Sequence, residues 1–134
     1  MNVIVDTSVW SLALRRTLVQ RGSEKEELVE LIREGRVALI GAIRQEILSG
    51  IRTNDQYKRL RDRLRAFPDV PLDESDYEEA AVCFNTCRAK GIQGSNTDFL
   101  ICAVSMRRQM PVLTTDRDFV SFAKVLDFEL HEPR

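Results

Sequence analysis

Short apolar runs alternate with longer amphipathic segments along the chain, a pattern typical of β-strands that alternate with α-helices. Residues 2–6, NVIVD, form a β-branched run that is short enough for a buried strand. The runs at 36–43 and 110–115 are expected to be two more core strands, and residues 127–132 a terminal strand. This alternation predicts an α/β fold with a mostly parallel sheet, helices on both faces and right-handed crossovers.

The segments between the strands have helical periodicity and residues that start or end helices. The helix from Ser23 begins with SEKE, which is typical of a capping box, and Gly35 ends it. A later helix is expected to have its N-cap at Ser75. The helix from Ser95 is apolar on nearly every side, which predicts a central helix covered by other elements. The expected helices span residues 9–16, 23–35, 44–51, 54–66, 75–91, 95–108 and 116–125.

The size and composition of the chain are those of one globular domain. It has 134 residues, of which 43% are hydrophobic, and we expect a single domain over 1–134. The 20 Lys and Arg nearly balance the 21 Asp and Glu, so the net charge of −1 argues neither for nor against a nucleic-acid partner. Any affinity for a polyanion must therefore be local.

The cysteines and the apolar runs bear on cellular location. Cys83, Cys87 and Cys102 are odd in number, lack CxxC spacing and lie in apolar helical stretches, so they are expected to be buried thiols in a reducing cytoplasm. Zinc is not expected, because the only histidine, His131, lies near the C-terminus. No apolar run approaches the ~20 residues of a membrane span, and no charged-then-apolar leader precedes the first strand. We expect a cytoplasmic protein with no membrane partner.

Four acids fall where the predicted topology turns from strand to helix. Asp6 ends the first strand, Asp116 follows the third, Glu46 lies in the first turn after the second, and Asp98 opens the most buried helix. Parallel α/β sheets place their functional sites beyond the carboxyl ends of the strands. Each acid also has a structural interpretation, as a helix cap or as a solvated side chain. Together, however, they are expected to meet at one edge of the sheet.

A cluster of carboxylates has a definite chemical consequence. Two carboxylates ~4 Å apart repel each other by about 4 kcal/mol at an effective dielectric constant of 20, so four of them require a cation. Oxygen ligands without His or Cys favour Mg²⁺ or Mn²⁺. Such a site lowers the pKa of bound water and stabilises a leaving oxygen, which indicates hydrolysis of phosphate esters.

Several other enzyme classes are excluded by missing residues. A metal-free ribonuclease that works by general acid and base catalysis ordinarily needs two histidines, and this chain has one. The GxxxxGK[ST], GxGxxG and GxSxG motifs are also missing, which excludes the common classes of nucleotide-binding proteins and serine hydrolases. An aspartyl phosphatase would carry a second acid two positions after Asp6, where this chain has Ser8.

Four motifs in this order resemble those of the PIN-domain nucleases: VDTSVW, RQEIL, NTDFLICA and LTTDRDF. The small size is similar to that of the VapC-type toxins of toxin-antitoxin pairs. The resemblance implies a Rossmann-like sheet, Mg²⁺- or Mn²⁺-dependent endoribonuclease activity, a homodimer and a small cognate antitoxin that covers the active site.

The resemblance also implies roles for individual residues. Asp6, Asp98 and Asp116 match metal-binding acids of the family, and Glu46 matches a further acid of the catalytic set. The supporting residues are Thr114, which matches a hydroxyl position beside the acids, with Ser8 and Asp118. The alternatives are a PIN nuclease of RNA processing that is not a toxin, a PIN fold kept only for protein binding, and a Mg²⁺-binding regulatory α/β domain without catalysis.

Basic residues near the acids are the expected contacts to the RNA backbone, because phosphate neutralisation dominates nucleic-acid affinity. Arg44, two residues before Glu46, and Arg52 are the candidates. The segment 52–65 is strongly basic, with Lys58, Arg61 and Arg65 on one helical stripe. An ordinary solvated helix face explains that segment equally well. Trp10 is expected to anchor the core or a partner interface, or to stack on RNA.

Overall fold

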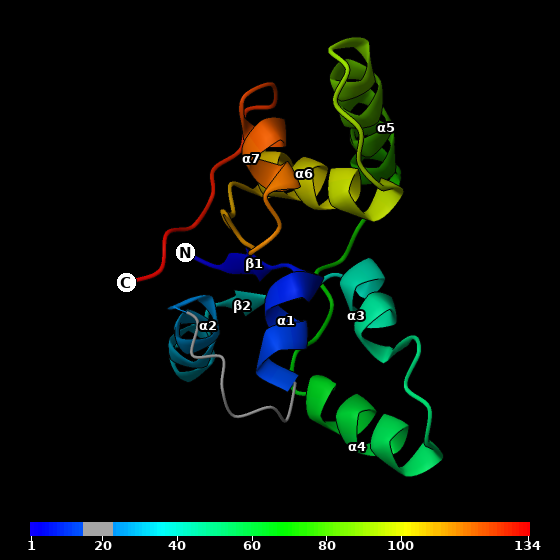
Figure 1. Ribbon diagram of the computed structural model, residues 1–134, viewed down its shortest axis with the longest axis vertical. Coiled ribbons are helices and arrows are strands. Elements are labelled where there is room, and N and C mark those ends of the chain that lie inside the picture. Colours follow the sequence, from blue (N-terminus) through cyan, green and yellow to red (C-terminus); the bar gives the residue numbers. More distant parts are fainter. Residues whose placement is uncertain (15–22) are drawn as a thin grey trace.

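The computed structural model describes residues 1–14 and 23–134 and shows, within them, a three-stranded parallel sheet in the order β2-β1-β3. Strand β1 (Val3–Val5) lies between β2 (Val37–Ala38) and β3 (Val112–Leu113) (Figure 1). All of β1 is fully buried, as its β-branched sequence predicts. The predicted α/β fold with a parallel sheet is confirmed.

Two isolated bridges widen this sheet. Leu39 pairs with Asp69 beyond β2, and Val112 pairs with Leu130 beyond β3, both in parallel. The backbone N–H of His131 donates to the carbonyl oxygen of Val112 at 2.7 Å. The predicted terminal strand over 127–132 is therefore reduced to a single bridge at Leu130.

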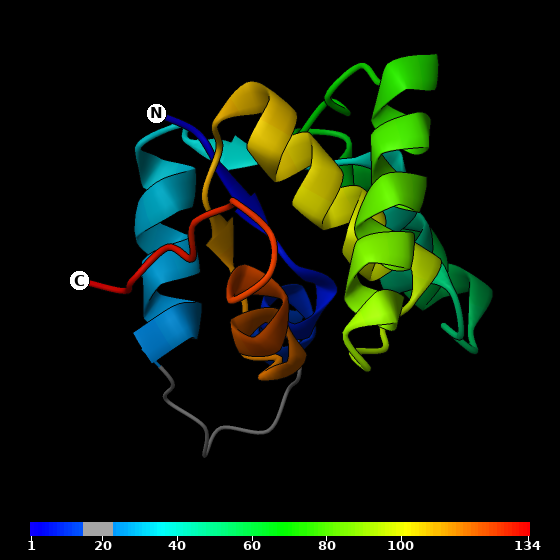
Figure 2. The same cartoon turned by 90° about the horizontal axis from the view of Figure 1, so that it is seen from above.

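Helices cover both faces of the sheet, with α6 and α7 on one side and α1 and α2 on the other (Figures 1 and 2). The predicted first helix extends to residues 15 and 16, which lie outside the described residues. No helix in the described ranges has both the length and the apolar character to cross a membrane. The helices are α1 (Thr7–Leu14), α2 (Ser23–Arg33), α3 (Gly41–Leu48), α4 (Asn54–Leu64), α5 (Glu74–Ala89), α6 (Asn96–Arg108) and α7 (Asp118–Ala123).

The boundary between β2 and α3 differs from the prediction. The apolar run 36–43 was expected to be one strand, but α3 begins at Gly41, with Ile40 as an N-cap of extended conformation (φ −112°, ψ 154°). Ile40 and Ile43 are both fully buried, one before the helix and one within it. Because strand and helix both bury apolar side chains here, the apolar run does not show where one gives way to the other.

Helix α6 is the central helix that its sequence predicts. Every residue from 99 to 105 is buried. The ring of Phe99 contacts those of Phe84 on α5 and Phe122 on α7, with centroid distances of 5.4 and 4.9 Å. Burial of each such ring stabilises the fold by about 1.5–3 kcal/mol. The buried stripe of α6 therefore joins the sheet, α5 and α7.

A buried carboxylate, that of Asp76, fixes α5 against the end of α6. Its N-capping partner is Asp73, not the predicted Ser75, and Asp73 and Asp76 form a capping box. Asp76 accepts from Arg107 Nη1 at 2.7 Å and from Arg108 Nη2 at 2.8 Å. The hydrogen bonds from Arg108 hold the pKa of Asp76 well below its ordinary value, against the opposing effect of burial.

The three cysteines lie on these two helices and are free and buried, as predicted. Burial raises the pKa of the Cys83 thiol to about 11 and also raises the pKa of Cys102. Thiols of this kind are unreactive at neutral pH.

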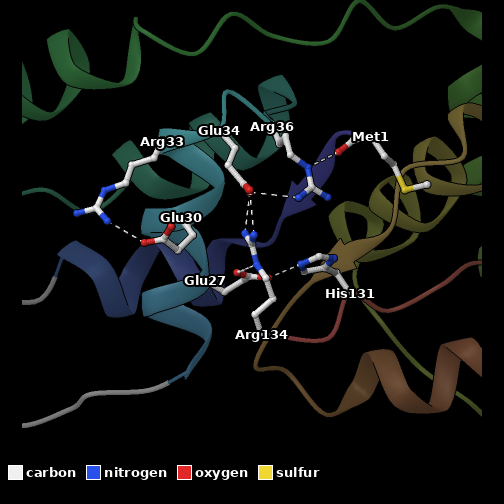
Figure 3. A network of polar contacts seen from close by, with 8 residues as sticks. All are labelled: Met1, Glu27, Glu30, Arg33, Glu34, Arg36, His131 and Arg134. Atoms are coloured by element: carbon white, nitrogen blue, oxygen red, sulfur yellow. Dashed lines mark hydrogen bonds and ion pairs between the residues drawn. The ribbon is translucent and has the colours of Figure 1, made fainter.

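The C-terminal residues are fixed to α2 by a polar network (Figure 3). Glu27, only 3% exposed, lies 2.6 Å from His131 Nε2 and accepts from Arg134 Nε at 3.0 Å. Burial acts to raise the pKa of Glu27, but the bonds from His131 and Arg134 outweigh it and leave the pKa lowered. Arg134 also donates to Glu34 at 2.7 Å, which lowers the pKa of Glu34 to about 2.

Replacement of Asp76 tests the connection between α5 and α6. Asp76→Ala removes a cap and leaves Arg107 and Arg108 without their buried partner, so we expect the free energy of unfolding to fall by about 2–4 kcal/mol. Urea unfolding measures this change. The matched control is Asp62→Ala, because Asp62 is 60% exposed and its ion pairs with Arg61 and Arg65 lie at the surface; a loss there as large as that of Asp76→Ala would contradict the assignment.

Candidate active site

A cleft of about 590 Å³ lies at the carboxyl edge of the sheet. Its walls come from the residues after β1 and β3, from α1 and α3, and from the start of α6. All four acids predicted from the sequence line it. The lining residues are Asp6, Thr7, Ser8, Ala42, Gln45, Glu46, Ser49, Thr97, Asp98 and Asp116.

Asp6 is the most deeply placed of these acids, at 5% exposure. Its backbone continues the ladder to β3, with Asp6 N donating to Leu113 O at 2.9 Å. Its Oδ2 accepts from both Ser8 Oγ and Thr114 Oγ1, each at 2.8 Å. Because both hydroxyls donate to the same oxygen, Oδ1 is free of hydrogen bonds to the described part of the chain. Two of the three residues predicted to support the acids, Ser8 and Thr114, therefore bond directly to Asp6.

Asp98 has two roles in the structure. It forms a capping box with Ser95, in which Ser95 N donates to Asp98 Oδ2 and Asp98 N donates to Ser95 Oγ, each at 3.1 Å. Burial raises the pKa of Asp98, and the negative charges of Asp6 and Asp116 raise it further, against the bonds from Ser95. The same carboxylate thus caps α6 and is repelled by the negative charges of Asp6 and Asp116.

Glu46 is the exposed acid of the cleft and is held by a residue that sequence reasoning missed. Thr7 Oγ1, on α1, donates to Glu46 Oε1, on α3, at 2.7 Å. This bond joins the two helices that follow β1 and β2. The sequence signal for Thr7 was its place between Asp6 and Ser8. Ser49 was also missed, although it lies about one helical turn after Glu46 and so on the same face of α3.

The two acids after β3 differ in position. Asp116 lines the cleft, and its Oδ1 accepts from the backbone N–H of Asp118 at 2.9 Å. The backbone N–H of Asp116 in turn donates to Thr114 Oγ1 at 3.0 Å. Asp118 is exposed, begins α7 and is not among the lining residues. Of the two, the structure brings only Asp116 to the other acids.

The carboxylates share the cleft without forming a compact cluster. Within residues 1–14 and 23–134, no three His, Cys, Asp or Glu side chains stand close enough together to hold a metal ion. The donors nevertheless fit a hard cation, because they are all oxygen atoms and include carboxylates whose charges repel one another.

The structure does not bring Arg44 to the cleft. Its guanidinium donates to Asp69 Oδ1 at 2.9 Å, to the carbonyl oxygen of Leu64 at 3.0 Å, and to that of Phe67. These bonds fix α3 to the end of α4 and to the chain beside β2. Arg52 lies in the exposed connection between α3 and α4.

The fold and the cleft together define a class: parallel α/β proteins with an acidic site at the carboxyl edge of the sheet. The sequence profile of the PIN domain family matches residues 3–125. The chain therefore belongs to the PIN domain family, and the predicted family is confirmed.

Relatives and solved structures match the chain over nearly its whole length. The chain is 26% identical over 129 residues to the VapC ribonuclease Mb1587 of Mycobacterium bovis, which covers 95% of this chain and 96% of that protein. Identity and coverage are the same for ribonuclease VapC11 of Mycobacterium tuberculosis. Among solved structures, VapBC2 from Rickettsia felis, bound to a DNA fragment from its promoter, has a TM-score of 0.77 at 16% identity and covers 98% of each chain. FitAcB from Neisseria gonorrhoeae has a TM-score of 0.75 at 20% identity and covers 98% of this chain and 97% of that chain.

The raised pKa of Asp98 predicts that its charge destabilises the metal-free protein. A carboxyl whose pKa is higher in the folded state costs stability once the pH rises above its unfolded value of about 3.9. Asp98→Asn removes the charge and keeps an acceptor for Ser95, so at pH 7 in EDTA we expect the free energy of unfolding to rise.

Urea unfolding at pH 7 and at pH 3 measures this effect. The gain should vanish near pH 3, where Asp98 is protonated in both states. Asp127→Asn, at an exposed position outside the cleft, should leave stability unchanged. Equal stabilisation by the two variants would contradict the repulsion within the cleft.

Proposed function

We propose that this chain is a Mg²⁺- or Mn²⁺-dependent endoribonuclease that hydrolyses RNA phosphodiester bonds as the toxin of a toxin-antitoxin pair. The observation that carries the proposal is the convergence of Asp6, Glu46, Asp98 and Asp116 on one cleft of a PIN domain. Proteins named as VapC ribonucleases, matched over 95% of the chain, support the choice of RNA as substrate.

We assign the metal site to Asp6, Asp98 and Asp116, which line one cleft and would have to move closer together on binding, because no three acids among the described residues stand at metal-binding distance. Ser8 and Thr114 hold Oδ2 of Asp6, which leaves Oδ1 for the cation. The capping box holds one oxygen of Asp98 in the same way. Once bound, the cation lowers the pKa of water and stabilises charge on the phosphate.

Glu46 has a different role from the three aspartates. It is exposed, so water reaches it, and Thr7 fixes its Oε1. Its Oε2 is the atom that takes a proton from the attacking water. A base must lie within hydrogen-bonding reach of the proton it removes, and the Thr7 bond limits the positions that Glu46 can adopt.

The proposed partners follow from the proteins that the chain matches. One of those structures is VapBC2 of Rickettsia felis, and the relatives are VapC ribonucleases, names that belong to toxin-antitoxin pairs. By analogy, this chain binds a small antitoxin that covers the cleft, forms a homodimer and acts in the cytoplasm. Its three free, buried thiols are compatible with a reducing compartment.

Cleavage of RNA with defined metals tests the proposed activity. We expect the purified protein to cleave single-stranded RNA with Mg²⁺ or Mn²⁺ and to lose this activity in EDTA. Asp6→Asn and Asp98→Asn should each lower kcat by roughly 100-fold or more, because each removes a metal ligand.

The matched control is Asp118→Asn, which makes the same chemical change at an acid outside the cleft and should keep activity within a few-fold. Cleavage that persists in EDTA, or in the Asp6 and Asp98 variants, would refute the metal site. If Asp118→Asn lowered kcat as much as Asp6→Asn and Asp98→Asn, the active site would have to include Asp118 at the start of α7.

Growth on induction separates a toxin from a housekeeping nuclease. Expression of the chain without an antitoxin should arrest bacterial growth, and Asp6→Asn should restore it at equal protein level. Normal growth with active enzyme present in the cells would favour the alternative of an RNA-processing nuclease.

A further inference from the structure

A second hollow lies beside α1, about one helical turn beyond the acidic cleft. It is a groove of about 480 Å³ between α1, α3 and α4, called here the α4 groove. Figure 1 shows these three helices next to one another, and α3 contacts both of the others. The lining residues are Ser11, Leu14, Ile47, Ile51, Gln56, Arg59, Leu60 and Arg63.

The groove continues the cleft along α1. On α1, Ser11 of the groove follows Ser8 of the cleft by three residues. On α3 the two sites use opposite faces of the helix: Ala42, Gln45, Glu46 and Ser49 line the cleft, whereas Ile47 and Ile51 line the groove. A chain that leaves the cleft along α1 therefore reaches the groove.

RNA in an acidic cleft requires cations outside it. The four carboxylates of the cleft repel phosphate wherever a metal does not neutralise them, and the net charge of −1 gives no general attraction. Arg44 is the arginine nearest to Glu46 in sequence, but its guanidinium donates to Asp69 and to two carbonyl oxygens and is not free to bind phosphate. The groove supplies the cations instead.

Arg59 and Arg63 are those cations. They are four residues apart and therefore share a face of α4 with Gln56. Both are exposed, and neither forms an ion pair with an acid among the described residues. The undescribed residues 15–22, RRTLVQRG, contain no acid.

The basic stripe that the sequence singled out, Lys58, Arg61 and Arg65, is a different one. Arg61 and Arg65 lie 3.1 and 3.6 Å from Asp62, which neutralises part of their charge. None of the three lines the groove.

The groove also has the chemical character that a nucleotide requires. Half of its lining is apolar, from Leu14, Ile47, Ile51 and Leu60, and offers surface to the face of a base. The other half consists of hydrogen-bonding side chains. Phosphate binds guanidinium groups in a two-pronged geometry, and amide and hydroxyl groups bind base edges or ribose.

We propose that the α4 groove binds the single-stranded RNA next to the scissile bond, with Arg59 and Arg63 neutralising two of its phosphates. This inference rests on the proposed function, because it assigns part of the substrate of the same cleft. It gives the enzyme a binding site for flanking nucleotides that is separate from the acids.

RNA binding without cleavage tests the proposal. Anisotropy of a labelled single-stranded 12-mer of uridine, measured in EDTA between about 20 and 200 mM salt, reports affinity and its salt dependence. The double variant Arg59→Gln/Arg63→Gln should raise Kd roughly tenfold. It should also reduce the slope of log K against log salt by about 1.4, the value for two single-strand phosphate contacts.

The matched control is Arg61→Gln/Arg65→Gln, which removes the same charge from the same helix outside the groove. We expect its Kd to stay within about twofold of that of the unmodified chain. Equal melting temperatures for all three proteins check that the variants are folded.

Three outcomes would overturn the proposal: unchanged RNA affinity in the groove variant, an equal loss in the control, or no binding by the unmodified chain at the lowest salt. The first would leave the groove to a protein partner, and the second would show a diffuse charge effect. Because the assay contains no metal and no cleavage, its result is independent of the proposed metal-dependent activity.

Discussion

The pairing of β1 with a parallel strand on each side is the interaction on which the rest of the structure depends. Ile4 is opposite Ala38 of β2 and Val112 of β3, so the three strands end at the same edge. This register brings Asp6, the start of α3 and Thr114 together although more than a hundred residues separate Asp6 from Thr114. Strands only two or three residues long suffice because every residue of β1 is fully buried. A shift of one residue would turn Asp6 away from the cleft and expose core side chains.

The acids show that a structural role and a chemical role can belong to one carboxylate. Asp98 caps α6 and is also subject to repulsion from Asp6 and Asp116. Asp116 accepts a backbone bond near the start of α7 and still lines the cleft. Capping uses one oxygen of a carboxylate and leaves the second, which is how a helix end can present an acid in a fixed orientation. For Asp98 and Asp116, a hydrogen bond to the backbone at a helix start is therefore compatible with a place in the cleft.

The sequence predicts the parts of the fold that local pattern determines. A few consecutive residues predict the β-branched run of β1, the start of α2 at Ser23, the capping box and the apolar surface of α6, and the four acids at strand and helix ends. What pattern does not show is long-range pairing. Arg44 is adjacent to the acids in sequence, yet its partner Asp69 lies 25 residues away and holds it elsewhere. The roles of Arg59 and Arg61 likewise differ because one faces a groove built by three helices and the other has Asp62 beside it. In the same way, the N-cap of α5 is Asp73 and not Ser75. The reciprocal partner of Asp73 in the capping box is Asp76, which is fixed by two arginines of α6.

The polar network around α2 has a topological consequence. Glu34 accepts from Arg134, and Arg36, bonded to Glu34 at 3.2 Å, donates to the backbone oxygen of Met1 at 2.7 Å (Figure 3). Met1 and Arg134, 133 positions apart in the sequence, are thereby attached to the same turn between α2 and β2. Because Arg36 and Arg134 share one acceptor, Oε1 of Glu34, local opening around Met1 and around Arg134 is coupled through this single carboxylate.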